Sequence, residues 1–117
     1  MTDSIQILHN PRCSKSRQTL ALLEAKGIEP EVILYLDTPP TAQELAVIIQ
    51  KLGITPRELM RNKETEFKDQ GLKDPELSDA QLIEAMINTP KLIERPIVIR
   101  GDKAVLGRPP ENIDELF

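Results

Sequence analysis

A single cysteine, Cys13, lies where a short apolar segment gives way to a segment with helical spacing. Residues 5–8 are largely apolar, Pro11 interrupts them, and leucines at helical intervals begin at Leu20. We therefore expect Cys13 in the turn that begins a helix, where free N–H groups and the helix dipole favour a thiolate. A thiolate is the nucleophilic form of cysteine, so this placement predicts nucleophilic chemistry. The alternative is a buried, inert cysteine.

The residues around Cys13 add charge and hydrogen-bonding groups. His9 would hold the thiolate or orient the loop, and the alternative is a surface histidine that caps the strand end. Ser16 completes a Cys-x-x-Ser motif, in which a hydroxyl can donate a hydrogen bond to the sulfur but cannot form a disulfide. Because the chain has no second cysteine, an oxidised Cys13 must be resolved by an outside thiol. Nearby positive charge comes from Arg12, Lys15 and Arg17.

Three arginines are candidates for binding an anion. Arg61 closes a short predicted helix, whereas Arg95 and Arg108 each directly precede a proline beside a predicted strand. A guanidinium group binds tetrahedral oxyanions well, and three of them beside a helix N-terminus would form an oxyanion site. Each arginine alone is most often a solvated surface residue, and only the fold can bring the three together.

Composition limits the class of protein. A chain of 117 residues with 39% hydrophobic and 29% charged residues is typical of one soluble globular domain. The net charge of -4 argues against a nucleic-acid partner, and no apolar run approaches the roughly 20 residues that span a bilayer. We expect no membrane partner and no signal peptide. With one cysteine, these features predict a cytoplasmic protein.

The first elements form a strand–helix–strand unit. We expect a strand over 4–8, a helix over 14–26 that ends before Gly27, and a strand over 31–36. The second strand is apolar enough to be covered on both faces. A unit of this kind implies parallel strands joined by a right-handed crossover.

The middle of the chain is predicted to be helical. Three capping boxes begin at Thr41, Thr55 and Ser78, and their helices would end near Leu52, near Arg61 and before Pro90, respectively. The intervening stretch 62–77 is polar and would hold one weak helical turn or more.

The end of the chain returns to strands. Segments 96–100 and 103–106 flank a Gly-Asp turn, and a last helix is expected over 111–117. The order is β-α-β, a helical block, then β-β-α. This order predicts an α/β, thioredoxin-like fold with a mixed four-stranded sheet, as a single domain over 1–117 with a helical insertion at about 41–90. On that layout the first strand, the loop of Cys13 and the start of the last hairpin converge at one end of the sheet.

Seven short motifs follow one another across nearly the whole chain. They are His-Asn-Pro-Arg-Cys at 9–13, Ser-Arg at 16–17, Ile-Leu-Tyr-Leu at 33–36, Pro-Pro at 39–40, Leu-Met-Arg at 59–61, Glu-Arg-Pro-Ile-Val at 94–98 and Gly-Arg-Pro at 107–109. Each motif is short, but the ordered set is specific. With this set the chain resembles the glutaredoxin-dependent arsenate reductases of the ArsC family.

The resemblance implies a role for each candidate residue. Cys13 would attack arsenate, His9 would assist it, and the hydroxyl of Ser16 would hydrogen-bond the sulfur. Pro96 would be the cis-proline of the fold, at a bond type where a cis peptide is permitted. The oxyanion-binding arginines of the family correspond to Arg61, Arg95 and Arg108.

The resemblance also implies the partners. Arsenate would be the substrate, glutathione a co-substrate, and glutaredoxin the protein that completes reduction to arsenite. No bound cofactor and no metal are implied, since one cysteine and one histidine make a poor ligand set. The chain departs from the family in Ser14-Lys15, where a smaller pair is usual, and in ending at Phe117 without a C-terminal extension.

Two other functions share these features. Spx-like regulators, which bind RNA polymerase under thiol stress, resemble the same fold but often carry Cys-x-x-Cys. A glutathione-linked thiol transferase would share Cys13 and the Cys-x-x-Ser motif but would not need three arginines.

Overall fold

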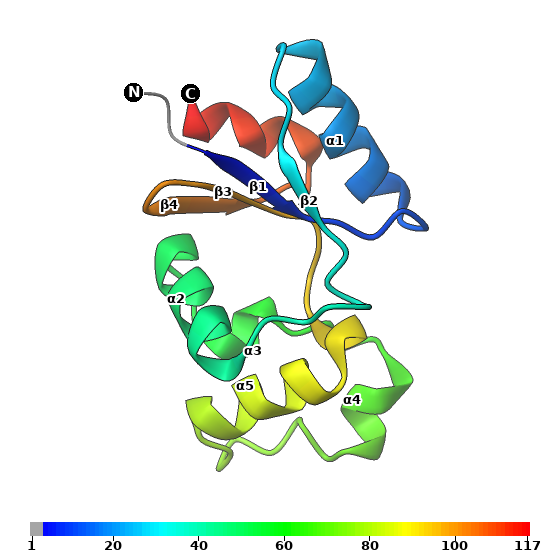
Figure 1. Ribbon diagram of the computed structural model, residues 1–117. Coiled ribbons are helices and arrows are strands. Elements are labelled where there is room, and N and C mark those ends of the chain that lie inside the picture. The colour runs from blue at the N-terminus through cyan, green and yellow to red at the C-terminus, as the bar shows by residue number, and fades with distance from the viewer. Residues whose placement is uncertain (1–3) are drawn as a thin grey trace. The chain divides into compact units, whose positions relative to one another are not determined.

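The computed structural model describes residues 4–117, which form two compact units. The first, here called the sheet unit, comprises residues 4–38 and 95–117, and the second, the helical unit, comprises residues 39–94. The helical unit corresponds in sequence to the insertion predicted at about 41–90. Each unit is built from its own elements, and the number of domains stays a prediction (Figure 1).

The sheet unit contains a mixed four-stranded sheet in the order β2-β1-β3-β4. Strand β1 pairs in parallel with β2 and antiparallel with β3, and β3 pairs antiparallel with β4. Leu8 is opposite Ile97, and Ile97 is opposite Leu106. The end of β1, the start of β3 and the end of β4 therefore lie side by side, as predicted. The strands are Ile5–Leu8 (β1), Glu31–Ile33 (β2), Ile97–Arg100 (β3) and Lys103–Leu106 (β4).

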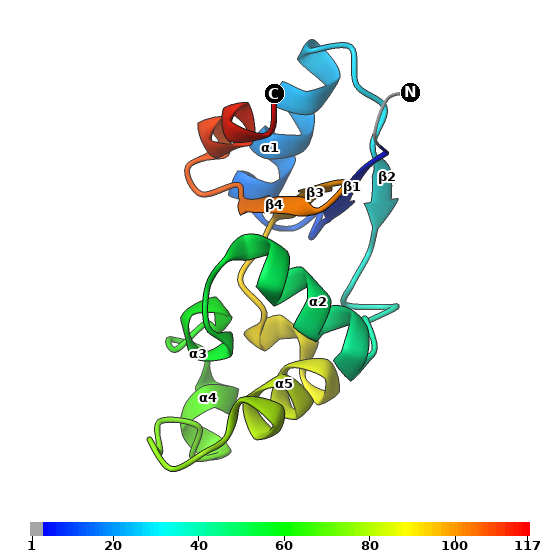
Figure 2. The same cartoon turned by 90° about the vertical axis from the view of Figure 1, so that its left-hand side faces the viewer.

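Two helices lie on one face of this sheet. Helix α1, Ser14–Ala25, contacts the C-terminal 3₁₀ helix η2, Pro110–Leu116 (Figures 1 and 2). A cluster of buried aliphatic side chains joins the helices to the sheet, and it consists of Ile7, Leu23, Val98, Ile113 and Leu116. Burial of each such side chain stabilises the fold by about 1.5–3 kcal/mol, so this cluster holds the helices on the sheet.

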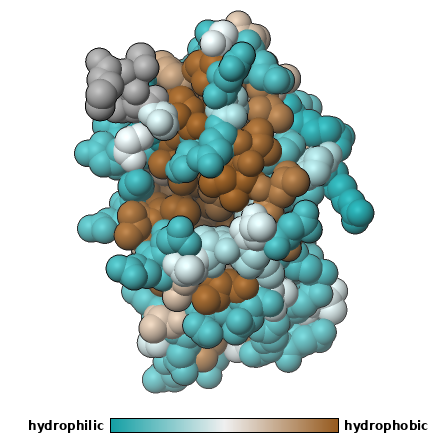
Figure 3. Space-filling view, viewed as in Figure 1, coloured by the Kyte–Doolittle hydropathy of each residue, from teal (hydrophilic) through white to brown (hydrophobic). Residues whose placement is uncertain are grey.

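Strand β2 differs from the prediction in length and in burial. It ends at Ile33, because the N–H groups of Asp37 and Thr38 both donate to the carbonyl of Leu34 and turn the chain. The strand is also at the edge of the sheet, and the side chain of Val32 is 44% exposed. The prediction of a strand over 31–36 covered on both faces was therefore wrong. Figure 3 shows apolar surface gathered over β2.

The last helix is a 3₁₀ helix where a helix over 111–117 was predicted. The main-chain N–H of Asn112 donates to the carbonyl of Pro109, three residues back. The side-chain amide of Asn112 donates instead to the carbonyl of Arg108, four residues back, which an α-helix would bond through the main chain. The asparagine side chain thus occupies the acceptor that an α-helical first turn would use.

The helical unit confirms the three predicted capping boxes. Thr41, Thr55 and Ser78 each accept a hydrogen bond from the backbone N–H three residues ahead, and the Glu or Gln at that position returns one. Helices α2 and α3 both pack against α5. No helix within residues 4–117 has the length and apolar character needed to cross a bilayer. The helices are Ala42–Leu52 (α2), Pro56–Leu59 (α3), Thr65–Asp69 (α4), Asp79–Asn88 (α5) and the 3₁₀ helix Pro90–Leu92 (η1).

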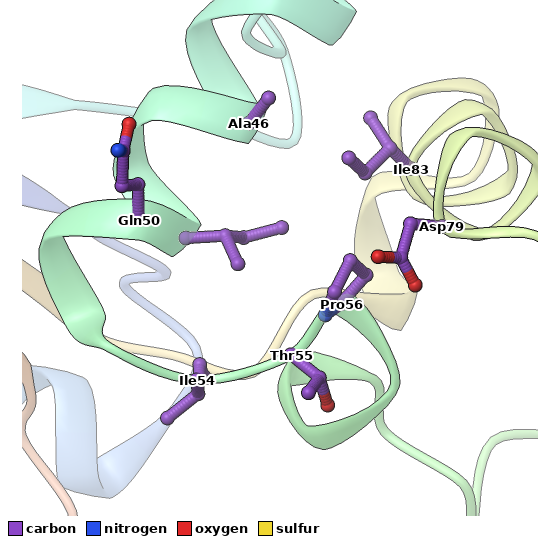
Figure 4. A pocket seen from close by; sticks show the side chains of 8 residues that line it. Ala46, Gln50, Ile54, Thr55, Pro56, Asp79 and Ile83 are labelled. Atoms are coloured by element: carbon purple, nitrogen blue, oxygen red, sulfur yellow. The ribbon is translucent and has the colours of Figure 1, made fainter.

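A hollow of about 380 Å³ lies in the helical unit between α2, α3 and α5 (Figure 4). Its walls are mainly aliphatic, with Ile54 and Ile83 among the lining side chains, and its charged group is the carboxylate of Asp79. An acidic group repels anions, so this hollow does not suit the oxyanion chemistry predicted for Cys13.

Candidate active site

Cys13 caps the N-terminus of α1 from an extended backbone conformation. Its N–H donates to the carbonyl of Asn10 at 3.0 Å, and its carbonyl accepts the N–H of Arg17 at 3.0 Å. The side chain is partly exposed, so the cysteine is not the buried one of the alternative, and its reactivity stays a prediction. Because the loop and the first helical turn both hold the residue, the sulfur is presented at the positive end of the helix.

The surroundings of Cys13 favour its ionised form. Partial burial is the largest single influence and opposes ionisation, but hydrogen bonds from the backbone N–H groups of Ser16 and Lys15 act against it. The guanidinium group of Arg95 adds both its charge and a hydrogen bond. Together these groups lower the pKa of the Cys13 thiol below its ordinary value. The sulfur is therefore activated by the helix and by an arginine.

Arg95 and Arg108 both reach Cys13. Nη1 of Arg108 donates to the sulfur at 3.8 Å and to the carbonyl of Arg95 at 3.3 Å. Arg95 lies two residues before β3 and Arg108 two residues after β4, so the pairing of these strands brings the two arginines together. The peptide bonds Arg95–Pro96 and Arg108–Pro109 are both cis, of which only the first was expected. The predicted convergence of these two arginines on Cys13 is thus found within the sheet unit.

Arg61 belongs to the helical unit. Its backbone N–H donates to the carbonyl of Leu92 at 2.7 Å. Its guanidinium group forms ion pairs with Glu64 at 3.2 Å and Glu94 at 2.9 Å. These two carboxylates orient the guanidinium group and partly neutralise it. The role of Arg61 in binding an anion at Cys13 stays a prediction.

The Ser16 hydroxyl does not make the contact that the resemblance implied. It lies 2.7 Å from Nδ1 of His9 and accepts the N–H of Asn10 at 3.0 Å, and the side chain is fully buried. The serine reaches Cys13 through its backbone N–H instead. The expected hydroxyl–sulfur bond is therefore wrong. The hydroxyl holds together the two ends of the loop that carries Cys13.

His9 is buried, with 6% of its surface exposed, so the alternative of a surface histidine is wrong. Burial is the main cause that lowers the pKa of His9 from 6.5, and the positive charge of Arg17 adds to it. The lowered pKa favours the neutral imidazole at pH 7, so His9 adds little positive charge beside the thiolate. Through the Ser16 hydroxyl it orients the loop.

Asn10 was not predicted to have a function of its own. Its side-chain carbonyl accepts the N–H of Arg12 at 3.0 Å, and its backbone carbonyl accepts the N–H of Cys13 at 3.0 Å. An asparagine directly before a proline favours such a turn, so the sequence did contain this signal. Asn10 shapes the loop so that the sulfur faces the two arginines.

The first testable consequence concerns the acidity of Cys13. We expect iodoacetamide to alkylate native Cys13 with a pH midpoint below that of the denatured protein. Because the pKa is lowered, more of the sulfur is thiolate at neutral pH than in the denatured protein, and the reaction slows as the pH falls through the lowered value. Mass spectrometry over a range of pH gives the midpoint, and the urea-denatured protein is the control. Equal midpoints for the two states would show that the fold does not activate this sulfur.

Comparisons with known proteins show which family the chain belongs to. An arsenate reductase of Haemophilus influenzae is 52% identical over 115 residues, covering 97% of this chain and 99% of that protein. The uncharacterized protein YfgD of Escherichia coli strain K12 is 53% identical over 117 residues, covering 99% and 98%. The structure of an arsenate reductase from Vibrio cholerae has a TM-score of 0.97, with 51% identity and 100% of each chain covered. The predicted thioredoxin-like α/β fold is confirmed. Since residues 8–116 also match the ArsC family, the chain belongs to that family.

Proposed function

We propose that this protein is an oxidoreductase that reduces arsenate to arsenite. The observation that carries the proposal is the contact of Arg108 with the sulfur of Cys13, at 3.8 Å, beside Arg95 and the first N–H groups of α1. A tetrahedral oxyanion is the ligand that such donors bind, and a thiolate among them attacks its central atom. Relatives that are named arsenate reductase at about half identity support the choice of arsenate.

In the first step the thiolate of Cys13 forms a bond to arsenic. One arsenate oxygen takes up protons and leaves as water, while Arg95 and Arg108 hold the remaining oxygens. Donors directed at the oxygens that carry charge stabilise the transition state. In this proposal His9 and Ser16 hold the loop, and Arg61 supplies a third guanidinium group.

The second half of the reaction uses outside thiols, because the chain has one cysteine and cannot form an internal disulfide. Glutathione displaces a second oxygen from arsenic, again as water. A thiolate of glutaredoxin then attacks the glutathione sulfur, and the electron pair of the sulfur–arsenic bond stays on arsenic. As(V) becomes As(III), and the two outside sulfurs become a disulfide. Water then replaces Cys13 on arsenic, which releases arsenite and the thiolate.

The decisive experiment is arsenate turnover by the purified protein. We expect arsenite to form when glutathione and glutaredoxin are both present, and turnover to stop when either is omitted. Arsenite is measured by chromatography with elemental detection, and oxidised glutathione is followed through a coupled reductase. A preparation that releases no arsenite with both thiols supplied would exclude the proposed function.

The same preparation separates the alternative thiol transferase. A thiol transferase would reduce a glutathionylated protein or peptide, and arsenate would not inhibit that reaction. If this protein is an arsenate reductase, arsenate should inhibit any reduction of such a mixed disulfide, because both reactions would need the sulfur of Cys13. A protein active on mixed disulfides but not on arsenate would fit the alternative.

A further inference from the structure

Thr19 joins α1 to the end of β4. Its hydroxyl lies 2.8 Å from the carbonyl of Lys15 and 3.1 Å from the carbonyl of Gly107, and the side chain is fully buried. A threonine inside a helix commonly bonds the carbonyl four residues back, so the contact with Lys15 is ordinary. The contact with Gly107 spans 88 residues of sequence. Because both acceptors are carbonyls, the single hydroxyl proton is shared between them.

Gly107 fits tightly at this point. Its N–H donates to the carbonyl of Pro96 at 2.9 Å, while its carbonyl accepts from Thr19. A Cβ atom added to Gly107 would lie 2.6 Å from the Thr19 hydroxyl and 2.8 Å from Cγ of Pro96. Both distances are shorter than real contacts, so a side chain at this position would displace its neighbours. The side chains of Thr19 and Pro96 leave no room for a Cβ atom, so this position requires glycine.

The junction formed by Thr19, Gly107 and Pro96 adjoins the segments that carry the site residues. Gly107 precedes Arg108, Pro96 follows Arg95, and Thr19 is on the helix whose first turn holds Cys13. The hydrogen bonds of the junction therefore connect the three segments that carry the sulfur and the two arginines. A shift of Gly107 would move Arg108 relative to the sulfur, because the two are adjacent in sequence.

We propose that Thr19 is a positioning residue: its hydroxyl, through Gly107, sets the guanidinium groups of Arg95 and Arg108 against the sulfur of Cys13. The consequence for arsenate rests on the proposed function. The consequence for the reactivity of Cys13 does not, because alkylation of the sulfur needs no arsenate.

The test compares Thr19→Val, which keeps the shape and removes the hydroxyl, with Thr19→Ser, which keeps the hydroxyl. We expect Thr19→Val to raise the pH midpoint of Cys13 alkylation toward that of the denatured protein. We also expect the KM for arsenate to rise about fivefold or more, with a smaller change in kcat, as for the loss of about one hydrogen bond. Thr19→Ser should retain the parent midpoint and KM. Loss of these properties in the valine variant and their retention in the serine variant support the proposal.

The matched control is Thr38→Val, which removes an exposed hydroxyl that donates to the carbonyl of Leu34 at 3.3 Å. It should change neither readout. If Thr19→Val lowers the thermal midpoint but keeps the parent alkylation profile and KM, Thr19 is merely structural and the proposal is overturned.

Gly107→Ala gives an independent test should Thr19→Val fail to fold, and an unchanged alkylation profile and KM in that variant would likewise overturn the proposal. A parent protein inactive on arsenate removes the proposed function but leaves the alkylation result intact.

Discussion

Cys13→Ser is expected to lower arsenate turnover by about 10⁴-fold or more, the usual cost of removing a covalent nucleophile. A serine hydroxyl is slightly smaller than the thiol and is not ionised at neutral pH, and within residues 4–117 the partners of the Cys13 sulfur are N–H donors, not a base. The imidazole of His9 is hydrogen-bonded to the Ser16 hydroxyl, so it orients the loop that carries Cys13. Measurement of arsenite release under the coupled glutathione and glutaredoxin conditions tests this expectation.

The serine variant should remain folded, because Cys13 is partly exposed and its backbone hydrogen bonds do not involve the sulfur. Circular dichroism and the thermal midpoint provide that control. It should also still bind arsenate, since Arg95, Arg108 and the helix N-terminus remain. A serine variant that turned over arsenate within about tenfold of the parent would show that another group is the nucleophile.

Arg95→Ala and Arg108→Ala are each expected to lower kcat/KM for arsenate by about 10- to 100-fold. Hydrogen bonds between charged groups contribute about 1.5–3 kcal/mol, which corresponds to this range. Alkylation of Cys13 should continue in both variants. Arg95→Ala should also raise the pH midpoint of alkylation, because the Arg95 guanidinium group lowers the pKa of Cys13. The thiolate present at pH 7 would then decrease.

Lys103→Ala is the control for the loss of one positive charge. Lys103 begins β4 and Arg108 follows the end of that strand, so the variant removes a similar charge away from the sulfur. It should leave kcat/KM close to that of the parent. If both arginine variants kept full activity, the oxyanion site would be misassigned even if Cys13 remained essential.

The elements that position the sulfur could be predicted because local signals set their ends. Pro11 and the first helical turn placed Cys13 at the start of a helix, and the Gly-Asp turn placed β3 beside β4. Because that pairing is antiparallel and local, Arg95 and Arg108 necessarily fall at the same end of the hairpin. The extent of β2 was not predictable in this way. An apolar run such as 31–36 fits a buried strand, and the turn at Leu34 depends on how the chain leaves the sheet.

The contacts of individual side chains could not be read from the sequence. The spacing of Ser16 and Cys13 allows the hydroxyl to face the sulfur, but the fold directs it toward His9 and Asn10. Thr19 carried no signal either, because a threonine within a helix is ordinary and its long-range partner is a backbone carbonyl. Such contacts depend on the packing of segments that are far apart in sequence.

The separation of 95 residues between Arg108 and Cys13 has a consequence for the newly made chain. Cys13 leaves the ribosome early. Strand β1, which precedes it, pairs with β3, whose residues are made near the end of synthesis. Helix α1 has 12 residues, and a helix of that length is marginal on its own in water. Arg95 and Arg108 are therefore set against the sulfur only after the last strands join the sheet. Until then, the sulfur lacks the charge and the hydrogen bond of Arg95 that contribute to its lowered pKa.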